Sequence, residues 1–501
     1  MFSHSKTNRY LVTPARGSTH RGKGMSGRAV LAFAIVGLAA LLTSGFATGG
    51  PSAFRFKLDL VGSNILMVGS QTSDLDMDPA RNVAYVGSFV DLGVAVVDMK
   101  DRVHPKVVKI LDTHYVRAGD RDNASDSADV DLHGNLLAVA SQPWRLSNFG
   151  FGGEGFGGVS LYDVTDPFKP VFKGQVSTGG THDVQIDPGY PNRPYVYAAN
   201  FESEDPDHGF KVSIIDASDL VRPTILADYA SPEPQGCEIE YGCAPFNAAH
   251  DLTLLAMSNG HTILYVAYWD SGFRLVDVTN ADRPREIGAI DYTPAPGPAL
   301  PINEASSGGT CCAHYVQPTP SGRYVVTEDE KGIGPAGDLH IYRADGCDGV
   351  GTCTLTWLSD WSPPGRDVQA AAINAAIRTN GSVYPNGIFQ RYFTRDIHNL
   401  DVREDMVLAP AYSSGIFLLD IKDKAKPTLI AFWQGAVNVK DACHGRNTLI
   451  PWGYQGDCYF QAREVWAARF GEAVPGSPSD FYIYSSDYWD GFLILRTVTQ
   501  R

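Results

Sequence analysis

The chain has 501 residues with 51 glycines, 31 prolines and an aromatic content of 11%, a composition that favours a turn-rich, all-β protein. Its formal net charge is -15. Because no basic stripe occurs after the N-terminal segment, this composition argues against nucleic acid as a partner, and we expect the acidity to serve solubility.

The N-terminal segment differs from the rest of the chain. Residues 1–28 are basic and polar, residues 29–42 form the apolar run AVLAFAIVGLAALL, and small residues follow. This order is typical of a secretory signal, so we predict that residues 1–47 are a signal peptide. The chain would then be exported to the periplasm, the cell surface or the medium. An uncleaved N-terminal anchor is the alternative, because residues 29–47 are nearly long enough to span a bilayer.

A short unit repeats through residues 54–501. Its clearest copy is GFRLVDVTNADRP, in which an apolar strand begins at Gly272 and ends at Asp277, and Pro284 closes a polar turn. The same Asp and Pro, seven residues apart, recur at Asp98 and Pro105, Asp163 and Pro170, Asp216 and Pro223, and Asp420 and Pro427. Two degenerate copies, GDLHIY and GFLILR, lack both residues. These copies constitute an internal repeat, which determines the fold.

Each copy also has two strand-like segments upstream and one downstream. The second upstream segment ends in small or aromatic residues, as in VAYVGSF, YVYAANF and MVLAPAY. Four short strands separated by turns are the pattern of one β-propeller blade. We therefore predict an all-β, seven-bladed β-propeller over residues 54–501. The strand at residues 54–62 would complete the last blade and close the ring, and a short surface helix is expected at residues 366–378.

The eight cysteines of the chain fall into three local pairs and one adjacent pair. The local pairs are Cys237 with Cys243, Cys347 with Cys353, and Cys443 with Cys458; the adjacent pair is Cys311 with Cys312. An even number of cysteines in an exported chain favours disulfide bonds. A metal-thiolate site is the alternative, but the sequence lacks paired C-x-x-C spacing.

A histidine begins the first strand in four consecutive copies of the repeat, as His182, His250, His314 and His398. The first strand of each propeller blade lines the central channel, so equivalent positions form a ring around the axis. Four imidazoles can hold iron or copper, in preference to zinc. We predict such a metal site, with the neighbouring Asp183, Asp251 and Glu464 as acceptors that fix the histidine tautomers.

The remaining copies place Ser73, Ala128 and Arg463 at the histidine position in our alignment. A structural role is the alternative interpretation, because repeated units inherit the same residue and buried imidazoles need hydrogen-bond partners. The histidine persists in the fifth copy, which has lost the Asp and Pro, and this favours a site. Tyr268, Trp269, Tyr488 and Trp489 could wall the channel mouth or pack between blades.

The frame shared by FRLVDVTNADRP and VSLYDVTDPFKP resembles the LVIVD repeat of secreted and cell-surface bacterial and archaeal proteins. The resemblance covers nearly all of the chain after the signal. It implies an exported β-propeller but no single activity. Carotenoid oxygenases and the selenium-binding protein (methanethiol oxidase) family are similar only in holding metals with histidines of a propeller, and no residue is carried over from them.

Two functions are compatible with these patterns. The first is a metal-dependent oxidoreductase acting on a small molecule. The second is a non-catalytic module that binds a protein or glycan partner. The sequence contains no nucleophile elbow, P-loop or haem attachment motif that would indicate another chemistry.

Overall fold

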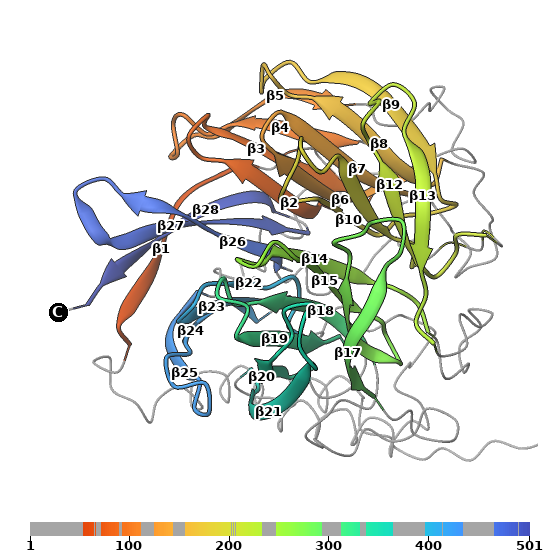
Figure 1. Ribbon diagram of the computed structural model, residues 1–501. Helices are drawn as coiled ribbons and strands as arrows, with labels where there is room; N and C mark the ends of the chain where they lie inside the picture. The colour runs from red at the N-terminus through yellow and green to blue at the C-terminus, as the bar shows by residue number, and fades with distance from the viewer. Residues whose placement is uncertain are drawn as a thin grey trace, which may run out of the picture. The chain divides into compact units, whose positions relative to one another are not determined.

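The computed structural model describes residues 54–64, 66, 72–89, 93–111, 125–143, 156–201, 203, 205, 207–232, 247–292, 312–330, 337–363, 396–412, 414–433, 465–488 and 490–500 (Figure 1). The predicted signal or anchor and the helix predicted at residues 366–378 lie outside these ranges. The described residues form β-strands, and none of their segments is a helix that could cross a membrane.

The first half of the chain contains strands β1 to β13. Their bounds are β1 (Phe56–Asn64), β2 (Thr72–Asp78), β3 (Val83–Ser88), β4 (Val94–Asp98), β5 (Lys106–Leu111), β6 (Ser125–His133), β7 (Leu136–Pro143), β8 (Gly158–Asp163), β9 (Val171–Ser177), β10 (Asp183–Ile186), β11 (Tyr195–Ala199), β12 (Val212–Asp216) and β13 (Thr224–Tyr229).

The second half contains strands β14 to β28. Their bounds are β14 (Asp251–Ala256), β15 (Thr262–Ala267), β16 (Gly272–Asp277), β17 (Arg285–Asp291), β18 (Ala313–Pro318), β19 (Tyr324–Asp329), β20 (Leu339–Asp345), β21 (Thr354–Trp361), β22 (Asp401–Val402), β23 (Met406–Ala411), β24 (Gly415–Asp420), β25 (Thr428–Trp433), β26 (Val465–Val474), β27 (Ser477–Asp487) and β28 (Gly491–Thr499).

The strands form antiparallel sheets that follow the order of the chain. Four sheets have four consecutive strands each, β10–β13, β14–β17, β18–β21 and β22–β25, and a larger sheet contains β2–β9. Within the larger sheet, β3 and β6 are joined through the pair Ser88 and Ser127. The last sheet has the order β1-β28-β27-β26, so the N-terminal strand is its outer strand, paired from Phe56 opposite Thr499 to Asn64 opposite Phe492.

The first strand of each repeat lies at the centre of the fold. These inner strands contact one another in a closed order, β2 with β6, then β10, β14, β18, β22 and β26, and β26 again with β2. Figure 1 shows them gathered around a common centre, with the later strands of each sheet farther out. Antiparallel sheets arranged radially around a central channel are a β-propeller.

The repeated Asp and Gly have local structural causes. The Asp277 carboxylate accepts a hydrogen bond from the main-chain N–H of Thr279 at 3.0 Å, and the Asp of each other full copy accepts one from the residue two positions on. Such Asx turns end the third strand. Gly272 has φ +87°, and a Cβ there would lie 2.1 Å from the Ile290 carbonyl oxygen, so only glycine fits.

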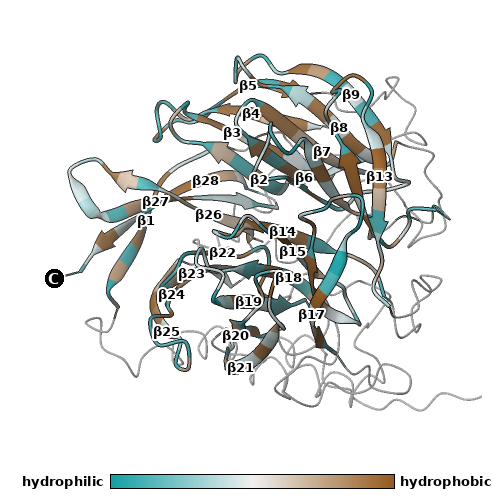
Figure 2. Ribbon diagram, in the orientation of Figure 1, coloured by the Kyte–Doolittle hydropathy of each residue, from teal (hydrophilic) through white to brown (hydrophobic). Residues whose placement is uncertain are grey.

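The hydrophobic core lies between neighbouring sheets. One cluster joins Tyr197 and Ile214 of one sheet to Leu264 and Val276 of the next, all fully buried. Figure 2 shows apolar residues concentrated along the strands. Burial of these apolar surfaces against the adjacent sheet is the main stabilising contribution to a fold of this kind, and it holds the inner strands in a fixed register.

Candidate metal centre

The inner strands direct their first residues toward the channel by a local irregularity. In β18 the register shifts between Ala313, which pairs with Asp329, and Tyr315, which pairs with Glu328. His314 is therefore the extra residue of a β-bulge, a feature that re-aims a side chain. Equivalent shifts occur in β6 and β26.

The four predicted histidines lie in one continuous arc. Successive ring centroids are 4.3 Å apart for His182 and His250, 4.4 Å for His250 and His314, and 4.2 Å for His314 and His398. His250, His314 and His398 are buried, and His182 is partly exposed. The equivalent positions predicted from the repeat therefore meet in space.

The arc continues from His398 to Trp466 and not to Arg463, which corrects the sequence alignment. The bridge between Tyr412 and Val465 corresponds to the bridge between Trp269 and Ala313, so the residue after Val465 is the equivalent of His314. The rings of Trp466 and His398 are 4.0 Å apart. The predicted acceptor Glu464 lies outside the part of the chain that the structure describes.

Each histidine uses its Nδ1 atom in a hydrogen bond to an oxygen. The pairs are His182 with Gln142 Oε1 at 3.0 Å, His250 with Asp251 Oδ2 at 2.8 Å, His398 with the Trp466 main-chain oxygen at 2.9 Å, and His314 with Glu328 in a short contact. Carboxylate and carbonyl oxygens only accept hydrogen bonds. With Nδ1–H donating, the lone pair of each neutral imidazole lies on Nε2, the arrangement found in metal-ligating histidines.

Asp251 thus lies where an acceptor for its neighbouring histidine was predicted, but Asp183 does not. His182 bonds to Gln142 of the preceding sheet, and Asp183 instead forms a hydrogen bond with Asp251. Burial, together with the nearby Asp129, raises the pKa of Asp183 well above its usual value, so its protonated carboxyl donates to Asp251.

Two groups of side chains could hold a metal ion. One ligand atom from each of His182, His250 and Asp251 lies within 4.8 Å of the others, and the same holds for His250, His314 and Glu330. His314 Nε2 is 3.7 Å from a Glu330 carboxylate oxygen and 3.8 Å from one of Asp251. It is buried without a hydrogen-bond partner, which is costly unless something else satisfies it.

The protonation of the histidines differs along the arc. Burial lowers the pKa of His182, His250 and His398, and the neighbouring imidazoles lower it further for each of them. Burial also acts against a charged His314, but Glu328, Glu330 and Asp251 outweigh it and raise its pKa to about 10. His314 therefore favours the positively charged form, while the histidines on both sides of it in the arc are neutral.

Beneath the histidines lies a layer of buried carboxyl groups. The residue after each histidine position is Asp74, Asp129, Asp183 or Asp251 in four of the inner strands, and all four are buried. Arg469 Nη2 contacts both Asp74 oxygens at 2.8 and 2.9 Å. Burial raises the pKa of Asp74 and Asp129. The number of negative charges in this layer is therefore smaller than the number of its carboxyl groups.

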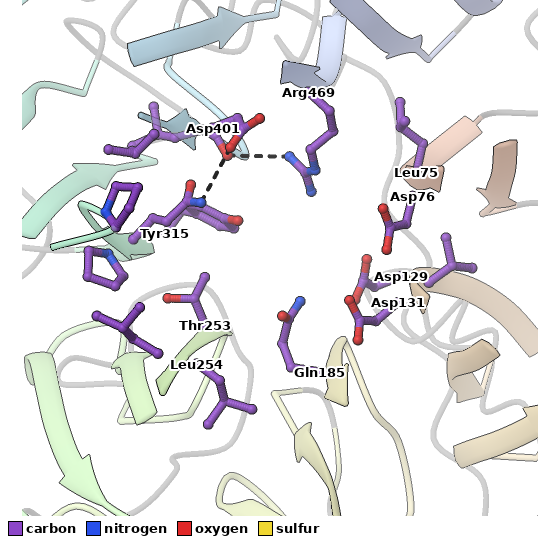
Figure 3. Close-up of a pocket in the computed structure, with 17 residues that line it drawn as sticks. Leu75, Asp76, Asp129, Asp131, Gln185, Thr253, Leu254, Tyr315, Asp401 and Arg469 are labelled. Carbon is purple, nitrogen blue, oxygen red and sulfur yellow. Dashed lines mark hydrogen bonds between the residues drawn. The ribbon is translucent and has the colours of Figure 1, made fainter. Parts of the chain in front are cut away.

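The opposite end of the channel is a cavity of about 340 Å³ lined by every inner strand. Figure 3 shows Asp76, Asp129 and Asp131 on one side of it and Arg469 above them. The acidic side chains accept hydrogen bonds from the main chain of the next inner strand: Asp76 from Leu132 N at 2.8 Å, Asp131 from Ile186 N at 2.7 Å, and Asp401 from Phe470 N at 2.6 Å. These side chains therefore tie neighbouring inner strands together.

The aromatic residues expected at the mouth divide into two groups. Trp269 stacks on His250 with centroids 4.9 Å apart, and Tyr488 stacks on Trp466 at 5.7 Å. Tyr268 instead belongs to a core cluster and donates its hydroxyl to the Phe210 carbonyl, because its side chain points into the sheet interface. Trp489 lies outside the described residues.

Of the predicted disulfides, the structure contains Cys347–Cys353, which closes the turn between β20 and β21. Cys312 is also disulfide-bonded. Cys237, Cys243, Cys311, Cys443 and Cys458 fall in segments that the structure does not describe.

No family model matches this sequence, and no curated protein matches it. Its fold is similar to the β-propeller domain of Cps50 (Swd1) from Myceliophteria thermophila, with a TM-score of 0.51 and 12% identity over 88% of this chain and 100% of that one. A protein from Lactobacillus plantarum also matches, with a TM-score of 0.40 and 15% identity over 58% of this chain and 72% of that one. A functionally unknown protein from Desulfotomaculum acetoxidans matches with a TM-score of 0.44 and 11% identity over 74% of this chain and 89% of that one. The first likeness supports the β-propeller fold alone.

Proposed function

We propose that this chain is an exported metalloprotein whose arc of His182, His250, His314 and His398 binds a transition metal ion at the end of a propeller channel. The two groups of close ligand atoms in this arc share His250. The observation that carries the proposal is the shared use of Nδ1. All four imidazoles donate this nitrogen to an oxygen, which leaves Nε2 of each ring as the potential ligand atom. At His314, whose pKa is about 10, the ion would displace the Nε2 proton. The oxygen partner differs from one histidine to the next, so the shared use of Nδ1 is not a copy of one inherited hydrogen bond.

Imidazole nitrogen is a ligand of iron, copper and zinc alike, and we propose iron or copper because an oxidoreductase needs an ion with redox chemistry. The bound ion would supply electron transfer or polarisation of a small molecule, and the proposed activity is that of an oxidoreductase. The protein's own contribution is to hold the rings through Gln142, Asp251 and Glu328. Glu330 and Asp251 provide negative charge beside the ion.

We further infer a propeller of seven blades and a relationship to the LVIVD repeat proteins. In this reading the sheet of β2–β9 is two blades joined through the single pair Ser88 and Ser127. Residues 1–47 would be the signal peptide or an N-terminal anchor. Mass spectrometry of the protein recovered from the producing cells tests this part, since an intact Met1 in a soluble fraction would contradict both export routes.

The decisive experiment measures the metal content of purified protein by elemental mass spectrometry. We expect about one equivalent of iron or copper per chain, and less than a tenth of this in a variant carrying both His250→Ala and His314→Ala. His208→Ala is the matched control, because this histidine is partly exposed and paired with Asp228 away from the arc. It should retain the metal.

The opposite outcome is equally informative. If the wild-type chain binds no metal after reconstitution with iron, copper or zinc, the oxidoreductase is ruled out. The chain would then be a binding propeller for a protein or glycan partner, with histidines of structural importance only. Circular dichroism of each variant verifies that the fold is retained.

A further inference from the structure

The histidine arc is bordered by a second set of equivalent side chains at the ends of the second strands. The residue after each histidine position pairs with a residue of the second strand, as Asp183 pairs with Ala199 and Asp251 with Ala267. The position in question lies two residues after that partner, at Phe201 and Trp269 in these examples. Five such positions are aromatic, and we name them the aromatic collar: Phe89, Phe201, Trp269, Tyr412 and Tyr488. The other two positions hold Gln142 and Glu330.

The collar is in direct contact with the imidazoles. The Phe201 ring is 4.3 Å from that of His250 and 5.0 Å from that of Trp269. On the other side of the arc, Tyr412 is 5.0 Å from His398. A molecule resting on the collar would therefore lie beside the histidine Nε2 atoms.

Four of the five collar residues differ in exposure from the aromatic residues of the core, while Tyr412 is buried. Tyr197, Tyr265 and Phe273 are fully buried in the sheet interfaces, whereas Phe89, Phe201, Trp269 and Tyr488 keep part of their surface accessible. Trp269 and Tyr412 also have φ values of +41° and +33°. This backbone region is unfavourable for bulky residues, and it is found where function requires it.

One acidic group is placed between the aromatic rings. Glu330 accepts a hydrogen bond from the Tyr412 hydroxyl through Oε1, while its Oε2 lies 3.7 Å from His314 Nε2. Glu330 is partly exposed, so Oε2 can accept a hydrogen bond from a ligand. Anionic ligands are disfavoured here because Asp251, Glu328 and Glu330 all lie around His314.

We propose that the aromatic collar binds a small aromatic molecule with a hydroxyl or amine donor, of the class of phenols and aromatic amines, over the histidine arc. The ligand ring would pack in offset or edge-on contact with Phe201 and Trp269, and its donor group would bond to Glu330. This inference rests on the proposed function, for which it names the substrate class.

The test is equilibrium binding of 4-methylphenol to the purified full-length chain, with 4-methylcyclohexanol as the non-aromatic probe of equal size. Titrations use both the chelator-treated and the metal-loaded protein. We expect the phenol to bind about tenfold more tightly than the alcohol, as ring contacts of this kind allow. Phe201→Leu and Trp269→Leu should each weaken phenol binding by a similar factor without loss of metal.

Trp357→Leu serves as the control, because Trp357 is an exposed indole on the outer strand β21, and it should bind the phenol as wild type does. Equal affinity for the two probes overturns the collar proposal, and so does unchanged phenol binding in both Phe201→Leu and Trp269→Leu. Phenol binding to a chain that takes up no metal would overturn the metal site and leave the collar standing.

Discussion

The two ends of the channel are built from the same inner strands, yet their polar side chains are used differently. At the cavity end, Asp76, Asp131 and Asp401 each accept a main-chain hydrogen bond from the neighbouring strand. At the histidine end, Nδ1 is bonded and Nε2 of His314 is buried without a partner. The carboxyl groups at the cavity end thus bind the main chain, whereas His314 Nε2 faces carboxylate oxygens of Glu330 and Asp251 at 3.7 and 3.8 Å, where a ligand atom could satisfy it.

This comparison predicts that variants at the cavity end lower stability and that variants at the histidine end lower ligand affinity. The largest effect is expected for Arg469→Leu. It leaves Asp74 buried without its counter-charge and removes the bonds from Arg469 to the Asn399 and Leu400 carbonyls. Breaking a buried ion pair costs about 3–5 kcal/mol, measured as the free energy of unfolding in urea.

The control for this loss is Arg222→Leu, because Arg222 forms an exposed ion pair with Asp219 at 3.0 Å. Its free energy of unfolding should change by less than about 0.5 kcal/mol. If the two arginine variants were equally stable, the cavity end would not be the structural half of the channel.

At the histidine end, we expect Gln142→Leu to weaken metal binding while the chain stays folded. Gln142 is buried and holds His182 Nδ1 at 3.0 Å. Loss of such an orienting partner typically lowers metal affinity about 10–100-fold, which competition with a chelator measures. Gln142→Glu keeps an acceptor oxygen and should lose less. Equal affinities in all three proteins would mean that His182 is not a ligand.

A separate prediction concerns the pH dependence of stability. Burial, with the nearby Asp76, raises the pKa of Asp131 to about 8, against about 3.9 in an unfolded chain. The folded state therefore holds a proton that the unfolded state releases, so the free energy of unfolding decreases as pH rises from about 4 to about 8.

Asp131→Asn should flatten this slope, since asparagine does not titrate but can still accept the hydrogen bond from Ile186 N. Urea unfolding at several pH values between about 5 and about 8 measures the difference. Parallel slopes for wild type and variant would show that Asp131 is ionised in the folded protein, and metal content should be unaffected in either case.

The repeat made much of this structure predictable. Alignment of the starts of the first strands placed His182, His250, His314 and His398 at equivalent positions, and equivalent positions of inner strands meet in a propeller. The β-bulge that lets His314 and Tyr315 both lie on the channel side has no signature in the sequence. The pattern also failed before β26, where Trp466 follows a long segment without repeat character.

The partners of the histidines were missed because they come from other strands. Gln142 and Glu328 lie on second strands, β7 and β19, which the sequence identified only as apolar segments. One signal was available. In the segment ends GSF, ANF, AYW and PAY an aromatic residue recurs, and the fifth copy has TEDE instead. That exception contains Glu328 and Glu330.

The pairing of β1 with β28 has a consequence for how the protein is made. Residue 64 ends β1 and residue 491 begins its partner β28, so β1 cannot pair until β28 has been synthesised. At about 5–20 residues per second this delay is on the order of 20 seconds to a minute and a half. During that time β1 has no partner. Its charged residues Lys57 and Asp59 disfavour pairing of the exposed edge of β1 with strands of other chains. The ring can close only after residues 491–499 have been synthesised.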